Sequence, residues 1–284
     1  MHTGAFHSIL KISVILVFIL FLAHCEPKEN VQLTVDAVDE SAGDVPAYKI
    51  ETPIATYYLE KEGVGLSSMI DRNGNDWISF HKKPGSGAGG EYRGFPNAVH
   101  RQDGNFFHPR NQSTQVSATS VEYEGPDRVT ITGTSGNGNW KCRWDFYPER
   151  CDFTMTRMAP GYKYWILYEG TPGGEYNETD WWITSAIEEK TPLTTDHDGD
   201  IPDPEWIAFG DKDLNRVIYL AHHQDDNESD RFYQMQKKMT VFGFGREGLT
   251  KFLDTVPRRF SIGFIESAEY SEIAREIRQV FLSE

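Results

Sequence analysis

The chain of 284 residues has little cysteine and little positive charge, with three cysteines and 28 lysines and arginines against 43 aspartates and glutamates. The net charge of −15 is spread along the whole sequence. It argues against a nucleic-acid partner, since phosphate binding needs a basic face. It also disfavours a polyanionic substrate, unless a local basic cleft serves one. The sequence lacks G-x-S-x-G, P-loop, Rossmann and zinc signatures, so no motif supports those classes.

No internal repeat and no alternation of strands with helices is present, which argues against solenoids and parallel α/β folds. Short alternating runs between Gly, Asn, Asp and Pro recur instead, and they predict strands. Clear examples are "RVIYLAHH", "MTVFGFG" and "RRFSIGFIE". Only the last segment has a helical pattern, with apolar residues on one face at Tyr270, Ile273, Ala274, Ile277 and Phe281. We expect an all-β antiparallel sandwich with a C-terminal helix.

The N-terminal run "ILKISVILVFILFLAHC" predicts a secretory signal, because it is apolar, short and follows a weakly basic start. Its end resembles the lipobox of bacterial lipoproteins, in which Cys25 would carry the lipid, although His24 departs from the usual small residue. Plain signal cleavage is the alternative. We expect a signal peptide over 1–24, a polar tether over 25–47 and a single β-sandwich domain over 48–284.

Two further cysteines stand in "KCRWDFYPERC". In an exported protein, Cys142 and Cys151 could form one short disulfide loop. The alternative is two separate thiols on a hairpin, because a bridge requires the two Cβ atoms to lie opposite each other.

The stretch "GGEYRGFPNAVHRQDGNFFHP" gathers polar and aromatic side chains between glycines, which favours a functional loop over a core strand. Its candidate site residues are Glu91, Tyr92, Arg93, Asn97, His100 and His108. Arginine suits a carboxylate because its planar fork donates two parallel hydrogen bonds, and histidine suits proton removal near neutrality. The alternative is a surface loop with paired arginine and solvated histidines.

Three other stretches carry candidate residues. Glu169 and Glu175 flank a Gly-Pro loop and could act as acid and base, or could be exposed acids of a turn. The run "DHDGDIPDPEW" resembles part of a calcium loop but does not complete the EF-hand pattern, so we expect no cofactor, with calcium as the alternative. In "YLAHHQDDNESDRFYQM", His222 and His223 point to opposite faces of a strand, so one of them, His222, is the candidate. Tyr233 is a candidate proton donor or sugar contact.

The segment "YKIETPIATYYLEKEGVGLSSMIDRNGNDWISF" resembles the first strands of galactose-mutarotase-like super-sandwiches. Its turn matches their D-x-x-G-x-D-W pattern through Asp71, Gly74, Asp76 and Trp77. This family hosts aldose epimerases, polysaccharide lyases and glycosidase accessory domains. The resemblance covers about 35 residues and implies the fold rather than the activity.

An epimerase of that fold would use a histidine acid, for which His222 could serve, and a late glutamate base that cannot be assigned. A lyase that cleaves a uronic-acid glycan needs a group for the C6 carboxylate, a base for the C5 proton and an acid for the leaving oxygen. Arg93 or Asn97, His108 or His222, and Tyr233 could supply them.

We therefore expect an exported protein of a Gram-negative bacterium, either an outer-membrane lipoprotein or a periplasmic protein. We expect it to degrade polysaccharide or oligosaccharide. Its expected activity is that of a lyase. The alternatives are a non-catalytic glycan-binding lipoprotein, a glycoside hydrolase and an epimerase-like enzyme. The expected membrane contact is through the lipid anchor only.

Overall fold

The computed structural model describes Met1 and residues 30–283. Cys25 and nearly all of the expected signal peptide lie outside the described residues. In the described part, every strand pair is antiparallel and one α-helix, α1 (Tyr270–Leu282), follows the last strand. This confirms the expected all-β sandwich with a C-terminal helix. Among these residues no helix combines the length and apolar character needed to span a membrane.

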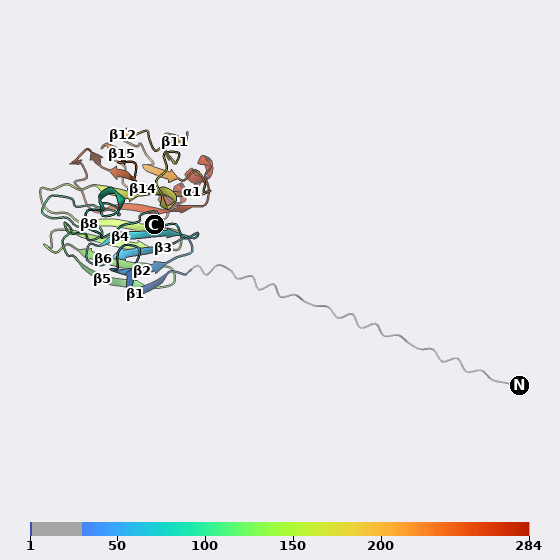
Figure 1. Ribbon diagram of the computed structural model, residues 1–284, viewed down its shortest axis with the longest axis horizontal. Helices are drawn as coiled ribbons and strands as arrows, with labels where there is room; N and C mark the ends of the chain where they lie inside the picture. The colour runs from blue at the N-terminus through green and yellow to red at the C-terminus, as the bar shows by residue number, and fades with distance from the viewer. Residues whose placement is uncertain (2–29, 284) are drawn as a thin grey trace.

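A nine-stranded sheet forms one layer of the sandwich. Its spatial order is β11 (Thr191–Pro192), β10 (Trp181–Thr184), β13 (Trp206–Gly210), β14 (Val217–His222), β19 (Arg258–Ile265), β8 (Cys151–Arg157), β7 (Lys141–Phe146), β6 (Val129–Thr134) and β5 (Ala118–Glu124). The strands near its β5 edge and those near its β11 edge lie at opposite ends of the molecule (Figure 1). The predicted strand runs correspond to β14, β16 and β19.

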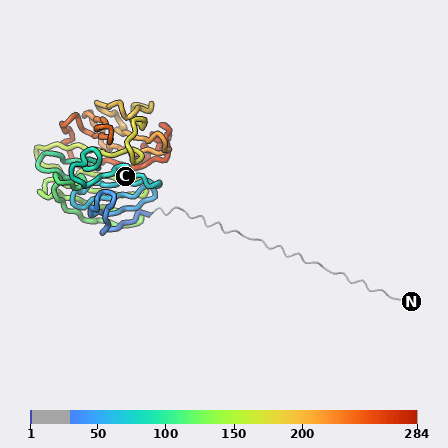
Figure 2. The backbone as a smooth tube through the Cα atoms, in the orientation of Figure 1, coloured from blue at the N-terminus to red at the C-terminus, as the bar shows by residue number. Residues whose placement is uncertain are grey.

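The second layer contains two four-stranded sheets. The first has the order β1 (Gln32–Asp39), β2 (Val45–Glu51), β3 (Ala55–Glu60) and β4 (Gly65–Asp71). The second has the order β12 (His197–Gly199), β15 (Asp230–Met235), β16 (Met239–Phe244) and β9 (Ile166–Gly170). The first comes from the N-terminal part of the chain, drawn in blue, and lies at the end opposite to the orange β15–β16 region (Figure 2).

A short loop segment joins these two sheets. Phe95 bridges to Leu66 of β4, and Gly94 bridges to Glu169 of β9. The stretch 89–109, in which the sequence concentrates polar side chains, therefore runs between the two sheets of the second layer. We call the segment around Gly94 and Phe95, which bridges β4 and β9, the seam. Short elements complete the chain, namely η1 (Gly87–Gly89), η2 (Pro172–Gly174) and the two-stranded β17 (Arg246–Glu247) and β18 (Thr250–Lys251).

One apolar cluster fills the space between the layers. At one end, the ring of Phe209 on β13 lies 5.4 Å from Phe232 of β15 and 6.0 Å from Phe242 of β16. At the other end, Tyr57 of β3 meets Phe146 of β7 edge to face at 5.3 Å. These contacts show that both four-stranded sheets pack on the same face of the nine-stranded sheet.

The helix α1 covers the opposite face of the nine-stranded sheet. Alternate residues of β13 and β14 face that side, because side chains along a strand point alternately to its two faces. They pack against the buried Ile273, Ile277 and Val280 of α1. Tyr270, Ala274 and Phe281 are partly buried in the same cluster. The predicted apolar face of the helix is confirmed.

Two expectations need correction. Residues 32–47, expected to belong to a flexible tether, form β1 and the start of β2, where the apolar Leu33 packs on the core. Cys142 and Cys151 are free, buried thiols, so the disulfide alternative is wrong. In the β7–β8 pairing Cys142 lies opposite Met155 and Cys151 lies opposite Phe146, which places the two thiols at opposite ends of the hairpin.

Candidate active site

The outer face of the β9–β16–β15 sheet carries the chemistry. Glu169 of β9 pairs with Val241 of β16, which in turn pairs with Tyr233 of β15, so the three side chains form one row. Their neighbours Tyr168 and Phe242 face inward into the core. Strand alternation therefore places a carboxyl and a phenol on either side of an apolar residue, on the sheet face away from the sandwich interior, where Ala88 covers Val241.

Glu169 is buried, with 6% of its surface exposed. Its Oε2 accepts a hydrogen bond of 2.8 Å from Asn97 Nδ2, and no hydrogen bond to Oε1 is found within residues 30–283. Burial raises the pKa of Glu169 to about 8, against the lowering effects of the Asn97 bond and the positive charge of Arg246. The carboxyl is thus mostly protonated at neutral pH and can exchange a proton slightly above it.

The His108 ring lies next to the Glu169 carboxyl. Its Nδ1 is 2.7 Å from the carbonyl of Pro109, so Nδ1 carries the proton and the neutral ring keeps a lone pair on Nε2. Nε2 is buried without a hydrogen-bond partner among the described residues and lies 3.7 Å from Glu169 Oε2. Burial lowers the pKa of His108 to about 4. Near neutrality the two groups are therefore a neutral acid facing a neutral base rather than an ion pair.

Two glycines allow His108 to approach. A Cβ at Gly65 would lie 2.7 Å from His108 Cα, and one at Gly94 would lie 2.8 Å from His108 Nε2. Gly94 also has φ +156°, a conformation that other residues rarely adopt. The ring position thus depends on glycines of both β4 and the seam.

Two cations border the row. Arg246 and Lys251 pair across the β17–β18 ladder, and Arg246 Cζ and Lys251 Nζ lie 5.0 and 4.1 Å from the ring centre of Trp165. Burial and the charge of Arg246 lower the pKa of Lys251 to about 8. Nη1 of Arg246 is buried and has no partner among the described residues. A free guanidinium N–H in this position suits an anionic ligand.

Arg246 also binds Tyr233. Its Nη2 donates a hydrogen bond of 3.2 Å to the phenolic oxygen, which leaves the phenolic proton free for another acceptor. Gly243, in the adjacent row, provides the space for this arginine, because a Cβ there would lie 2.9 Å from Arg246 Cδ.

His100 and Asn97 are tied to Trp165. The indole Nε1 donates a hydrogen bond of 2.8 Å to the carbonyl of Asn97, and the His100 ring stacks on the indole at 6.1 Å. Lys251 Nζ donates to the carbonyl of His100 at 2.6 Å. Burial lowers the pKa of His100 to about 4, so this ring is neutral near pH 7.

The structure thus brings together five of the residues singled out in the sequence: Asn97, His100, His108, Glu169 and Tyr233. The sequence reading missed Arg246, Lys251 and Trp165. Their signal was weak, since "GREGLTK" reads only as a turn with charges and Trp165 has the buried character of a core residue. Only the folded chain shows that this turn reaches Trp165.

The other residues of the 89–109 stretch lie apart from this cluster. Arg93 donates hydrogen bonds to the carbonyls of Lys238, at 2.9 Å, and Ser79, at 3.5 Å, so it ties the seam to the β15–β16 turn. Glu91 accepts a bond from the Gly85 amide, and Tyr92 is exposed. Glu175 is exposed at the end of η2 and makes no contact with Glu169 in the described structure.

His222 belongs to a different cluster inside the sandwich. Its Nδ1 lies 2.6 Å from Glu205 Oε2, and its ring stacks on Phe260 at 4.4 Å. Burial lowers the pKa of His222 and raises that of Glu205. His223 faces the other side, where it bonds Ser261, as strand alternation predicts. Glu205 Oε1 is buried without a hydrogen-bond partner among the described residues, and His222 Nε2 lies 3.3 Å from Arg258 Nη1.

The acidic run that resembles part of a calcium loop forms β12 and the loop after it. Asp198 accepts a 2.6 Å bond from Arg231 of β15. Within the described residues, no three His, Cys, Asp or Glu side chains converge as metal ligands.

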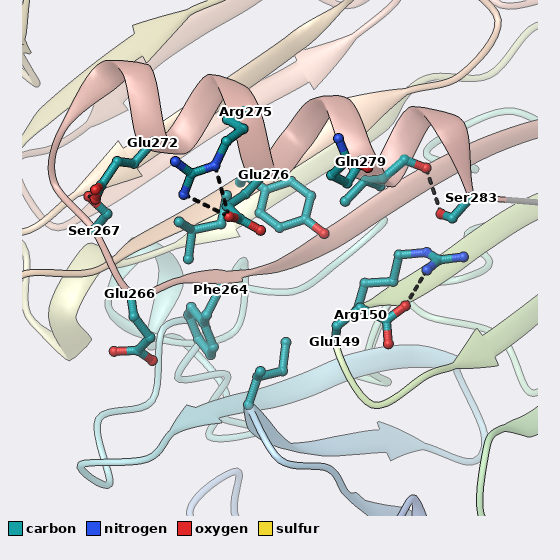
Figure 3. A pocket seen from close by; sticks show the side chains of 14 residues that line it. Glu149, Arg150, Phe264, Glu266, Ser267, Glu272, Arg275, Glu276, Gln279 and Ser283 are labelled. Carbon is teal, nitrogen blue, oxygen red and sulfur yellow. Dashed lines mark hydrogen bonds and ion pairs between the residues drawn. The ribbon is translucent and has the colours of Figure 1, made fainter. Parts of the chain in front are cut away.

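A hollow of about 600 Å³ lies between α1 and strands β14 and β19 of the nine-stranded sheet, near Glu149 (Figure 3). Among the charged side chains that line it, Arg150 pairs with Glu149 at 2.5 Å and Arg275 with Glu276 at 3.0 Å, while Glu266 pairs with Arg216 and Glu272 accepts a hydrogen bond from Ser267. Both arginines of its lining are thus paired with carboxylates, and the Glu169 row is the candidate site.

No protein-family model and no curated protein matches the sequence. Among solved structures, HI1317 superposes with a TM-score of 0.53 at 14% identity, over 83% of this chain and 99% of that chain. A putative mutarotase, YeaD from Salmonella typhimurium, gives a TM-score of 0.47 at 13% identity, over 78% of this chain and 90% of that one. The α-galactosidase from Lactobacillus brevis gives 0.44 at 11% identity, over 84% of this chain and 42% of that one. The likeness to HI1317 is one of fold.

Proposed function

We propose that this protein is a carbohydrate-active enzyme that cleaves a uronic-acid-containing glycan by β-elimination. The observation that carries the proposal is the row formed by Glu169 and Tyr233 with the cations Arg246 and Lys251 at its border. The sequence resemblance to galactose-mutarotase-like super-sandwiches supports a sugar as the substrate.

The cations would hold the sugar carboxylate. Arg246 has an unpartnered Nη1, and Lys251 stands beside it on the neighbouring strand. In a protein of net charge −15, two adjacent cations on one face select an anionic group. Neutralising the C6 carboxylate acidifies the C5 proton, which is the first requirement of the reaction.

Glu169 would remove that proton. With a pKa of about 8 its carboxylate is a stronger base than an ordinary glutamate, and its Oε1 has no competing bond within residues 30–283. The C5–H electron pair forms the C4–C5 double bond, the C4–O4 bond breaks, and the proton moves to Glu169. Asn97 and His108 are positioning residues. Asn97 donates a hydrogen bond to Oε2 of Glu169, and His108 Nε2 lies 3.7 Å from the same oxygen.

Tyr233 would protonate the leaving oxygen. Since Arg246 donates to its phenolic oxygen, the phenolic proton points away from the arginine and is available to O4. Tyr233 then regains a proton from water, and Glu169 releases the C5 proton to water, so both groups return to their starting states. Val241, between the two groups, is buried and packs against Ala88.

The test is the ultraviolet absorbance of the unsaturated uronate product over a panel of acidic glycans. Signal with the wild type, and none with Glu169→Gln, supports the proposal. Reducing sugar without absorbance indicates hydrolysis, and binding without either product indicates a glycan-binding module. Either of those two outcomes contradicts β-elimination.

We also propose that the protein is exported and anchored through lipid at Cys25, on the basis of the lipobox-like end of its apolar N-terminal run. Intact-mass analysis of the native protein tests this. A mature terminus at another residue contradicts it.

A further inference from the structure

A basic pocket lies between the segments 82–84 and 110–112. Its volume is about 520 Å³, and its lining residues are Gly43, Lys82, Lys83, Pro84, Arg110, Asn111 and Gln112. The lining contains three cations and no acid, although acidic residues outnumber basic ones in the chain by 43 to 28. Such a local reversal of sign attracts an anion to one spot of an otherwise repelling surface.

The two lysines are free to bind. Lys82 and Lys83 are exposed, and neither forms a side-chain hydrogen bond or ion pair within the described residues. Their backbone is nevertheless fixed, since the Lys82 amide donates to the carbonyl of Ala42. Arg110 is held in place by Glu62 and by the carbonyl of Thr114. The pocket thus combines one anchored cation with two unpaired ones.

We infer that this pocket binds a second anionic group of the same glycan chain, a carboxylate or sulfate on a sugar away from the cleaved bond. The inference rests on the proposed function for the identity of the ligand. It resolves the conflict between the charge of the whole molecule and a polyanionic substrate, because the substrate would meet cations at both places where it is held.

The pocket and the Glu169 row share one loop. Pro84 lines the pocket, while Ala88 packs on Met239 and Val241 beside Tyr233. Ala88 is the fourth residue after Pro84, so their Cα atoms lie within about 14 Å of each other. On the other side, Asn111 of the pocket donates to the carbonyl of Glu91 in the same loop. A chain of a few sugars can therefore reach from one to the other.

The experiment measures the Kd of long and short oligomers of alginate and polygalacturonate, and of heparin and inorganic sulfate, on a Glu169→Gln background that prevents turnover. Lys82→Glu and Lys83→Glu are expected to raise the Kd of long oligomers about 10-fold and to remove their advantage over short ones. The matched control is Lys141→Glu, an exposed lysine on β7 that makes the same charge change outside the pocket. Added salt should weaken wild-type binding more than that of the pocket variants.

The inference is overturned if the pocket variants bind long oligomers as Lys141→Glu does, or if none of these polyanions binds the parent protein. Sulfate binding alone, with no preference for long chains, also overturns it and indicates a free-anion site. Charge-dependent binding of long chains without any unsaturated product from the wild type refutes the lyase proposal and leaves the pocket assignment standing.

Discussion

Tyr233 and Glu169 stand in one row of the second-layer sheet, on strands β15 and β9, with Val241 of β16 between them. Two inter-strand spacings put their backbones about 10 Å apart, and both side chains rise from the same face. The proposed base and acid thus stand on either side of Val241, which is buried and packs against Ala88. The geometry is set by strand register, so it does not depend on a flexible loop.

Removing the phenolic oxygen tests the role of Tyr233. Tyr233→Phe keeps the ring but removes the proton for the leaving oxygen, so kcat should fall by at least about 100-fold. KM should change little, because Arg246 Nε still donates to the carbonyl of Gly248 and keeps the side chain in place. Steady-state kinetics measure both constants. Tyr123→Phe, at an exposed tyrosine of β5, is the control, and an equal loss there would refute the assignment.

The pH profile should be a narrow bell near pH 8. Glu169 must be ionised to accept a proton, so activity rises as pH approaches its pKa of about 8. Lys251 must be charged to bind the carboxylate, so activity falls as pH passes its pKa of about 8. Lys251→Arg keeps its charge at all these values and should extend activity to higher pH. An unchanged alkaline limb in this variant would contradict the role of Lys251.

Stability should also depend on Glu169. Its folded pKa of about 8 exceeds the ordinary 4.5, so the folded state binds more protons between those values and loses stability as pH rises through that window. Glu169→Gln removes this dependence. The variant should therefore gain stability relative to the wild type, by at most about 1.4 kcal/mol per pH unit, until the gain levels off above pH 8. Urea denaturation at several pH values measures it, and a constant difference would show that the carboxyl has an ordinary pKa.

The fold was predictable because it depends on local patterns. Alternation identified β14, β16 and β19, and helical spacing identified the face of α1 that carries Ile273 and Ile277. The β1 strand was missed because most of its residues are exposed and it lies in an acidic stretch typical of a tether, so only its pairing with β2 reveals it.

The site was predictable only in part. Loop context identified Asn97 and His108, but it could not show that β9 lies beside the seam, which brings them to Glu169. The same context could not show that Arg93 lies outside the candidate site. Its hydrogen-bond acceptors, the carbonyls of Ser79 and Lys238, are 14 and 145 residues away in the sequence. Long-range pairing is the information that residue types do not carry.

Gly243 should matter for substrate affinity. A methyl group in Gly243→Ala would lie 2.3 Å from Leu167 Cδ2 and 2.9 Å from Arg246 Cδ, so the arginine must shift away from Tyr233. A displaced binding group should raise KM for an acidic glycan about 10- to 100-fold. Gly89→Ala is the control, since a methyl there meets open space. Equal kinetics for the two variants would mean that Arg246 does not hold the substrate.

The helix should contribute to stability through its buried face. Ile277 of α1 is fully buried against the outer side of the nine-stranded sheet, so Ile277→Ala should cost about 2–5 kcal/mol in free energy of unfolding. Leu282, at the end of the same helix, is 71% exposed, and Leu282→Ala should change stability by less than about 0.5 kcal/mol. Chemical denaturation of the three proteins measures the difference. Because α1 lies on the opposite face of the nine-stranded sheet from the Glu169 row, folded Ile277→Ala should retain its kcat. A matching loss of kcat would show that the helix and the site are coupled, and an Ile277→Ala cost near zero would show that α1 does not pack on the sheet.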